Sequence, residues 1–275
     1  MKKLSIFILA LMVLSCNRAT LIEPLVDLTC DDTSVFEYSN GLKYTFDKNN
    51  IVVALEQKTK PVINTYDFKY DRTRLIFSDK NISANFEQSR SIALNEKGAI
   101  KSYEDNSGET LKKGVYEYDG DNRLMKISVT YSSIDNPNLF QIHYQVLKWE
   151  NDNIVTMSYY FKYGNESEKL QKAINFKYGN TEILDKDNFY NLAFFDSPNI
   201  NIGGLLYLDY LGLNKGKAPK NIPVKYTIID NSGQIADRGV GEYSYQMDKF
   251  NRISNIKISN NANQSVVKSF NYLCH

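Results

Sequence analysis

Apolar and polar residues alternate with a period of two along most of the chain. After Leu124, for example, the apolar residues Ile127, Val129 and Tyr131 alternate with the polar residues Lys126, Ser128 and Thr130. Successive side chains of a strand point to opposite faces, so this alternation predicts strands with one buried face. The chain also has twenty Tyr, fourteen Phe and only six Pro. Aromatic residues suit a half-buried pleated surface, which strengthens the prediction of strands.

A turn motif interrupts the alternation at intervals. In each copy an acid or Asn is followed three residues later by Asn, Gly or Arg, and two residues after that by an apolar residue. The first four of seven copies are spaced 24 residues apart and the rest irregularly; they start at Asp47, Asp71, Asn95, Asp119, Glu150, Asp230 and Asp248. Asp and Asn bond their own backbone at a bend, and Asn or Gly accepts a positive φ there. Two strands of about eight or nine residues plus two short turns fill such a period, so each unit predicts a hairpin.

These units predict a single all-β domain over residues 31–275, built as an antiparallel β-meander of repeated hairpins. The recurring turn acids are interpreted as structural, because a catalytic carboxylate is not needed in seven copies. No copy has the full spacing of a calcium loop, so no metal site is predicted.

Alternation is lost between residues 185 and 223, where apolar residues cluster instead: Phe189, Leu192, Phe194, Phe195, Leu205, Leu206, Leu208 and Leu211. Asp187 or Asn188 is suited to cap a short helix, and Gly203-Gly204 would separate it from a second one. An isolated sheet needs a second layer to bury its apolar face. The segment is therefore predicted to be a partly helical insertion that covers one face of the meander, with a lid or a partner-docking element as the alternative.

The N-terminus predicts an export signal and a lipid anchor. A short positive head precedes an apolar run over residues 4–14, which is shorter than the ~20 residues that a spanning helix needs. This pattern is typical of a signal peptide, here residues 1–15. The letters VLSC, ending at Cys16, resemble a bacterial lipobox, which implies a diacylglyceryl group on Cys16 and a lipidated tether over residues 16–30. The protein is expected to be anchored to a membrane rather than to span it.

Two further motifs carry a resemblance to known repeat families. Residues 116–124 read YEYDGDNRL, which resembles the YD-type repeats of large bacterial β-shell proteins. Together with the lipobox and LGLNKGKAPKNIP at residues 211–223, the hairpins resemble a Bacteroidetes lipoprotein family, the domain-of-unknown-function family 4595. The resemblance spans most of residues 31–275, implies a β-repeat domain of the cell envelope, and supplies no catalytic residues. Surface lipoproteins of this type usually carry acids after the lipidated Cys. Asn17 and Arg18 stand there instead, which favours the periplasmic side of the outer membrane over the cell surface.

Two cysteines remain once Cys16 is acylated. An extracytoplasmic compartment permits disulfides, and the termini of a domain often lie close together. A bridge between Cys30 and Cys274 is therefore predicted as a candidate, and two free thiols are the alternative.

A basic loop follows the insertion. Four lysines lie within eleven residues: Lys215, Lys217, Lys220 and Lys225. A loop of this kind is a candidate interaction site for phosphate head groups, acidic glycans or a protein partner, and a solvated loop is the alternative. The whole chain has a net charge of +1, so no overall field attracts nucleic acid, and no nucleic-acid partner is predicted.

The sequence contains few of the residues and motifs that enzyme active sites use. The chain has only two His, His143 and His275, and it lacks zinc-site spacing, a nucleophile elbow and a phosphate-binding Gly-rich loop. His143 alternates with Gln141 and Gln145, so this side of its strand is predicted to be polar or solvent-facing. No catalytic residue and no cofactor is predicted.

These observations predict a non-enzymatic, lipid-anchored envelope protein that binds or scaffolds another envelope component through its β-repeat surface. A glycan-binding lipoprotein is the first alternative. Sugar sites favour stacking aromatic rings, and with Trp149 as the single Trp, exposed Tyr would have to serve. A hydrolytic enzyme with two carboxylates in a cleft is the second alternative.

Overall fold

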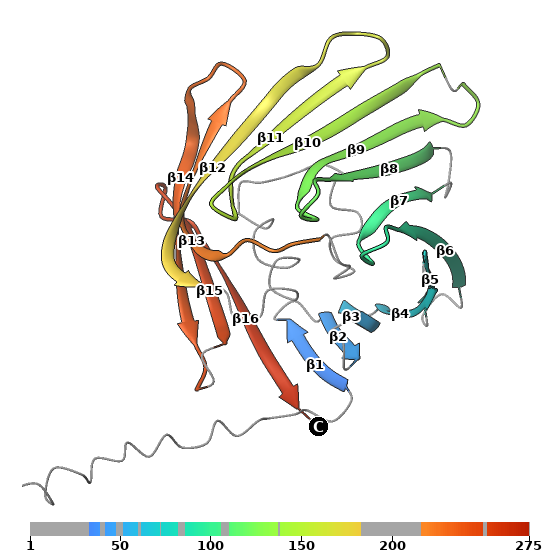
Figure 1. Ribbon diagram of the computed structural model, residues 1–275, viewed down its shortest axis with the longest axis horizontal. Helices are drawn as coiled ribbons and strands as arrows, with labels where there is room; N and C mark the ends of the chain where they lie inside the picture. The colour runs from blue at the N-terminus through green and yellow to red at the C-terminus, as the bar shows by residue number, and fades with distance from the viewer. Residues whose placement is uncertain are drawn as a thin grey trace, which may run out of the picture.

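The computed structural model describes residues 33–38, 42–47, 52–59, 62–71, 73–81, 86–105, 110–136, 138–182, 216–249 and 252–274. This part of the chain contains sixteen strands (Figure 1). Within these ranges there is no helix long and apolar enough to cross a membrane.

The strands follow the order of the chain. They are β1 (Thr33–Tyr38), β2 (Leu42–Asp47), β3 (Val52–Thr59), β4 (Val62–Asp71), β5 (Arg74–Asn81), β6 (Phe86–Leu94), β7 (Ile100–Asp105), β8 (Thr110–Tyr118), β9 (Leu124–Ser133), β10 (Phe140–Glu150), β11 (Asn153–Tyr163), β12 (Lys169–Glu182), β13 (Asn221–Asp230), β14 (Ile235–Met247), β15 (Ile253–Asn260) and β16 (Ser265–Cys274).

Each strand pairs antiparallel with the strands before and after it in the chain. The first strand also pairs with the last, with Val35 on β1 opposite Leu273 on β16, and this pairing closes the sheet into a barrel. Figure 1 shows β1 and β16 side by side where the ring of strands meets. The predicted all-β antiparallel meander is confirmed. Its closure was not predicted, because the sequence-based interpretation expected the insertion to cover the sheet.

The two ends of the barrel differ in which chain ends and which turns lie there. At one end β1 begins at Thr33, opposite Asp47, and β16 ends at Cys274, opposite Ser34. We call this the proximal end, and the turns after β2, β4, β6, β8, β10 and β14 lie there. The distal end carries the turns after β9, β11, β13 and β15.

The repeated Asp and Asn residues shape the turns. The Asp119 Oδ1 atom accepts hydrogen bonds from the backbone N–H groups two and four residues on, at 3.0 and 2.9 Å. Asn122, three residues after Asp119, has a φ of 62°. Asn95 and Asp230 make the same pair of hydrogen bonds in their own turns. The interpretation of these residues as turn formers is confirmed, and in the described turns it explains the spacing of the motif.

The predicted insertion at residues 185–223 falls mainly outside the described residues, and so do the helices expected in it. Its last part is described. Residues 216–220 are irregular, and β13 begins at Asn221, inside the range expected for the insertion.

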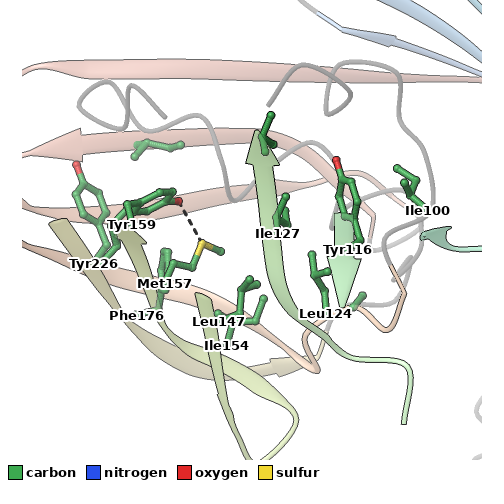
Figure 2. Close-up of a cluster of buried hydrophobic side chains, with 14 of the residues drawn as sticks. Ile100, Tyr116, Leu124, Ile127, Leu147, Ile154, Met157, Tyr159, Phe176 and Tyr226 are labelled. Atoms are coloured by element: carbon green, nitrogen blue, oxygen red, sulfur yellow. Dashed lines mark hydrogen bonds between the residues drawn. The ribbon is translucent and has the colours of Figure 1, made fainter. Parts of the chain in front are cut away.

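Buried side chains occupy alternate positions and face the inside of the barrel. They form one cluster (Figure 2), which contains Leu75, Ile92, Leu94, Ile100, Tyr103, Tyr116, Leu124, Ile127, Val129, Leu147, Ile154, Met157, Tyr159, Ile174, Phe176, Ala218, Ile222, Tyr226, Ile228, Tyr243, Ile253, Ile256 and Ile258. The opposite face carries exposed ion pairs between neighbouring strands, such as Glu104 with Lys113 and Lys225 with Glu242. The inner face is therefore apolar, and the outer face is mixed, because exposed apolar side chains such as Ile76, Val115 and Val146 lie on it beside these ion pairs.

Candidate functional site

Five inward side chains on three adjacent strands form the candidate site, which we call the inner track: Tyr131, His143, Gln145, Tyr159 and Phe161. Strand pairing brings them together, because Gln145 lies opposite Tyr159 and His143 lies opposite Phe161. Positions two apart on a strand share a face. Leu147, two residues beyond Gln145, is buried in the core. The inner track therefore continues the core towards the distal end.

The base of the track is Gln145, whose side chain is fully buried at 0% exposure. Its Nε2 atom donates to the Tyr159 hydroxyl at 3.0 Å and approaches the Met157 sulfur at 3.4 Å. A thioether sulfur only accepts hydrogen bonds, so these contacts assign the amide nitrogen to this side and Oε1 to the other. The Oε1 atom has no hydrogen-bond partner among the described residues. It is an acceptor without a donor at the bottom of the track.

A second buried polar atom lies in the same row of side chains. Tyr116 on β8 is opposite Ile127 on β9, which in turn is opposite Gln145. The Tyr116 hydroxyl is buried and likewise lacks a partner in the described part of the chain. Burial raises the pKa of Tyr116, so the hydroxyl keeps its proton at neutral pH. The base of the track thus offers an acceptor and a neutral hydroxyl on strands two apart.

The middle of the track is an aromatic row. The His143 ring lies between the rings of Tyr131 and Phe161, with 5.2 Å between centroids on each side and interplanar angles of 74° and 68°. His143 is half-buried, and its burial lowers its pKa, which favours the neutral imidazole. The expectation that this side of the strand is polar or solvent-facing holds for Gln141, which is exposed, and is wrong for Gln145, which is fully buried. The buried Leu147 sets the phase of the alternation, and extending that phase back along β10 would have placed both His143 and Gln145 inside.

The distal rim of the track is apolar and exposed. Tyr163 on β11 is 42% exposed and pairs with Gln141, the next inward position after His143. Leu139 and Ile134, in the connection between β9 and β10, are 51% and 50% exposed. The exposure of the side chains therefore rises from the base of the track to its rim. Gln141 and Gln145 are four residues apart, which corresponds to about 14 Å at the usual rise of a strand.

One cation lies beside the base. Lys172 on β12 is opposite Tyr159, and its Nζ atom is 5.5 Å from the centroid of the Tyr159 ring. Burial lowers the pKa of Lys172. A cation over a ring face is attracted by the quadrupole of the ring, so this lysine helps to fix Tyr159 in place.

The predicted interaction loop is not one surface in the described part of the chain. Lys217 pairs with Asp152 at 2.8 Å, Lys220 pairs with Glu182 at 3.1 Å, and Lys225 pairs with Glu242 at 3.5 Å on the outer face of β13 and β14. Lys215 lies outside the described residues. The three described lysines serve different contacts, and their role as an interaction loop stays a prediction.

Residues 216–220 instead tie the proximal turns together. The Lys217 amide donates to the Asn122 carbonyl at 2.7 Å, and the Lys220 amide donates to the Asp152 carbonyl at 2.8 Å. Between them Ala218 is buried at the edge of the core. We call this segment the proximal strap. The segment GKAPK at residues 216–220 therefore has a structural role, which sequence reasoning missed because the strap and its partner turns lie far apart in the chain.

The remaining predicted site residues are partly described. Cys16 and Cys30 lie outside the described residues, so lipidation and the disulfide stay predictions. Trp149, considered for sugar stacking, donates from its indole nitrogen to the Leu124 carbonyl at 2.8 Å and packs against the core. No group of three or more His, Cys, Asp and Glu within the described ranges is placed to hold a metal ion.

Comparisons with known proteins bear on the fold. No protein-family model and no curated protein matches the chain, so the resemblance to family 4595 and to YD-type repeats is not confirmed. The solved structures that are similar to this chain include two crystal structures, both described as porin-like proteins. The one from Bacteroides vulgatus ATCC 8482 is 11% identical, with a TM-score of 0.54 over 89% of this chain and 98% of that one. The one from Bacteroides uniformis ATCC 8492 is 13% identical, with a TM-score of 0.54 over 89% of this chain and 97% of that one. At this level of identity the likeness concerns the fold alone: the chain folds like these porin-like proteins of Bacteroides.

Proposed function

We propose that this protein is a non-enzymatic, lipid-anchored binding protein of the cell envelope, which holds a largely apolar small molecule against the inner track. One observation carries the proposal. A row of half-buried aromatic side chains, Tyr131, His143 and Phe161, leads inwards from an exposed rim that contains Leu139 and Tyr163. Binding pockets are mostly apolar with a few placed polar groups, and the inner track has this composition.

Binding fits the surroundings of His143 better than catalysis does. General base catalysis by His needs the imidazole within reach of the proton that it removes, and a partner that orients the ring. The contacts of His143 are edge contacts with Tyr131 and Phe161. These contacts hold the imidazole as one aromatic surface among others.

The cell envelope is proposed from two independent features. The fold is similar to that of porin-like proteins from two Bacteroides species, and the sequence places a lipobox at Cys16. The outer face of the barrel suits a tethered protein, because Lys148 and Glu150 form an exposed ion pair on it. The periplasmic side of the outer membrane is the proposed location.

The tether would orient the site. The described chain begins at Thr33 on the proximal end, so the anchored residues before it would hold this end towards the membrane. The rim formed by Leu139 and Tyr163 would then point away from the lipid surface. Membership in family 4595, proposed from the hairpins and the strap sequence, agrees with an envelope lipoprotein.

Glycan binding on the outer face is the second candidate. Tyr144 on β10 lies directly opposite Tyr160 on β11, and the Lys126 Nζ atom is 4.6 Å from the centroid of the Tyr144 ring. Paired aromatic faces with a neighbouring cation offer a flat platform for a sugar ring, and the same surface would serve a protein partner. This candidate uses residues that alternate with those of the inner track, so single substitutions separate the two.

The test compares two neighbouring substitutions on β11. Full-length protein is extracted from its native envelope, and native mass spectrometry measures any small molecule that stays bound. Phe161→Ala removes an inward ring of the track, and Tyr160→Ala removes an outward ring of similar size as the matched control. We expect the bound molecule in wild type and Tyr160→Ala, and little of it in Phe161→Ala. Equal retention by both variants would contradict the proposal. Loss of polysaccharide binding in Tyr160→Ala alone would move the glycan candidate to first place.

A further inference from the structure

We infer that the outer face of β9, β10 and β11 binds an acidic oligosaccharide, with its sugar rings over Tyr144 and Tyr160 and its carboxylates beside Lys126 and Lys162. We call these four residues the outer platform. The inference goes beyond the inner track. It rests on the outer-face glycan candidate of the proposed function, for which it names the class of sugar.

The centre of the outer platform is a pair of aromatic side chains on an accessible sheet face. Tyr144 lies directly opposite Tyr160 on one side and opposite Ser128 on the other. All three side chains are half-buried, so part of each is open to solvent, and the neighbouring Val146 is 38% exposed. Directly opposed side chains on one face have Cβ atoms about 4.5–5.5 Å apart, so the two rings form one surface that a sugar ring can cover.

Hydroxyl groups border these rings. Burial raises the pKa of Tyr144, and the charge of Glu168 raises it further, so the phenol keeps its proton at neutral pH. Ser128, Thr130 and Ser158 occupy half-buried outward positions on the strands that flank β10. A hydroxyl both donates and accepts hydrogen bonds, and sugar hydroxyls do the same. The border of the platform therefore matches a sugar as well as its centre does.

The charge of the ligand follows from the lysines of these strands. Together β9, β10 and β11 carry three lysines and one carboxylate, which are Lys126, Lys148, Lys162 and Glu150. Lys148 pairs with Glu150 at 2.8 Å. Lys126 and Lys162 form no ion pair within the part of the chain that the structure describes. The three strands therefore have an excess of positive charge around the Tyr pair, and carboxylates of a ligand would complement it.

Two carboxylates border the outer platform. Glu117 on β8 lies opposite Lys126, but the Lys126 Nζ atom is held 4.6 Å from the centroid of the Tyr144 ring. A ring face attracts a cation, so this lysine is kept on the platform. Glu168 lies in the turn between β11 and β12, and its charge acts on Tyr144. It would repel a carboxylate at that border, so the carboxylates of the ligand are expected beside the two lysines.

The length of the ligand follows from the positions of these lysines. Lys126 lies opposite Val146, and Lys162 lies opposite Ile142, four residues away on β10. With two strand spacings between β9 and β11, the Cα atoms of the two lysines are about 15–20 Å apart. This separation favours an oligosaccharide over a single sugar.

The experiment measures the affinity of two matched probes by isothermal titration calorimetry on the full-length protein in detergent solution. The probes are trigalacturonic acid and its methyl ester, which share their sugar rings and differ in the negative charge. We expect wild type to bind the acid about tenfold more tightly than the ester, the usual worth of one hydrogen bond to a charged group. Added salt should reduce this preference, because it screens exposed charges. Equal affinities, or tighter binding of the ester, would overturn the inference.

Three variants connect the preference to the residues. Lys126→Met and Lys162→Met each remove one charge and keep most of the side chain, and Lys177→Met at an exposed position of β12 is the matched control. We expect each of the first two to bind the ester as wild type does and to reduce the preference for the acid several-fold, while Lys177→Met keeps it. A full preference for the acid in the double variant of Lys126 and Lys162 would reject the outer platform as the site.

Failure of the inference is distinguishable from failure of the proposed function. If neither probe binds wild type, the inference is rejected, while the inner track is still decided by the molecule that Phe161→Ala loses or keeps. If both probes bind equally and Tyr160→Ala weakens both, the outer-face glycan candidate stands and the acidic class is rejected. The comparison in wild type needs no variant, so it decides even where a substitution prevents folding.

Discussion

Tyr103 on β7 lies against Gly114, its cross-strand partner on β8, so closely that a Cβ atom at residue 114 would overlap the Tyr103 ring. The same relationship joins Tyr226 on β13 to Gly241 on β14. Glycine exposes the backbone of one strand, and the ring of the neighbouring strand covers it, an arrangement known to stabilise sheets. The two pairs explain why GVYEY at residue 114 and GEYSY at residue 241 share their glycine.

Substituting either glycine should therefore destabilise the barrel. Gly114→Ala and Gly241→Ala each force a ring to move within a packed core, which typically costs about 1–3 kcal/mol of the free energy of unfolding. Gly120→Ala is the matched control, because a Cβ atom there meets nothing within 4 Å. Urea unfolding followed by circular dichroism measures all three. A loss in Gly120→Ala as large as in the other two would refute the ring-over-glycine account.

A second recurring contact ties each of the four strands β8, β10, β12 and β14 to the strand before it. The Tyr118 hydroxyl donates to the Ile100 carbonyl at 2.7 Å. The same bond recurs from Tyr178 to Ile154 at 2.7 Å and from Tyr245 to Pro223 at 2.6 Å. In β10 the indole of Trp149 takes this place, donating to Leu124. These bonds run from side chain to backbone, and in these four strands they hold an inward ring near the proximal end.

Removing one of these hydroxyls should cost stability without removing a ring. Tyr118→Phe is expected to lower the free energy of unfolding by about 1 kcal/mol, the net worth of one such hydrogen bond. Tyr144→Phe on the outer face should change it little, because its hydroxyl does not make the recurring bond to the strand before it. Thermal unfolding of both variants against wild type gives the comparison. Equal effects of the two substitutions would mean that the bond to Ile100 contributes nothing specific.

The sequence predicts the strands and turns because both depend on neighbours in the chain. Period-two alternation identifies the strands, and Asp119 bonds amide groups only two and four residues away. The closure of the barrel depends on the pairing of β1 with β16. These two strands are at opposite ends of the described chain, so no local sequence pattern predicts their contact. The pairing of Lys217 with Asp152, 65 residues apart, is hidden for the same reason.

The inner track was missed for a different reason. Gln145 and His143 are polar, and polar residues are usually exposed, so their side of β10 was interpreted as solvent-facing. Burial on a strand is decided by the phase of the whole strand, and Leu147 shares their phase. Polar residues in phase with a buried apolar residue are therefore the sequence signal for polar side chains on the inner face of this strand.

The proximal strap should respond to acid. The hydrogen bond and the charge of Lys217 hold the pKa of Asp152 below its ordinary value. A carboxyl with a lower pKa in the folded than in the unfolded state stabilises the fold above its unfolded pKa, and this stabilisation is lost as the pH falls through the folded pKa, below about pH 4. Asp152→Asn should therefore be less stable than wild type at pH 7, with a smaller difference at pH 3.

Denaturant unfolding of wild type and Asp152→Asn at both pH values measures this change. Asp237→Asn is the control, because the side chain of Asp237 is 93% exposed. We expect the control to match wild type at each pH. A difference between wild type and Asp152→Asn that is as large at pH 3 as at pH 7 would show that the strap is not held by the charge of Asp152.

The seam between β1 and β16 is where a disulfide would act. Cys274 lies opposite Ser34, and Cys30 precedes Ser34 by four residues, a stretch of chain that reaches at most about 14 Å. A bridge between Cys30 and Cys274 would join the two strands that close the barrel, and a long-loop disulfide typically contributes about 2–4 kcal/mol. We expect non-reduced peptide mapping of the envelope-derived protein to show a linked Cys30–Cys274 peptide. A reducing agent should then lower the unfolding temperature of wild type and leave that of Cys274→Ser unchanged. Free thiols at both positions in the native material would rule the bridge out, and the seam would then be held by its strand pairing alone.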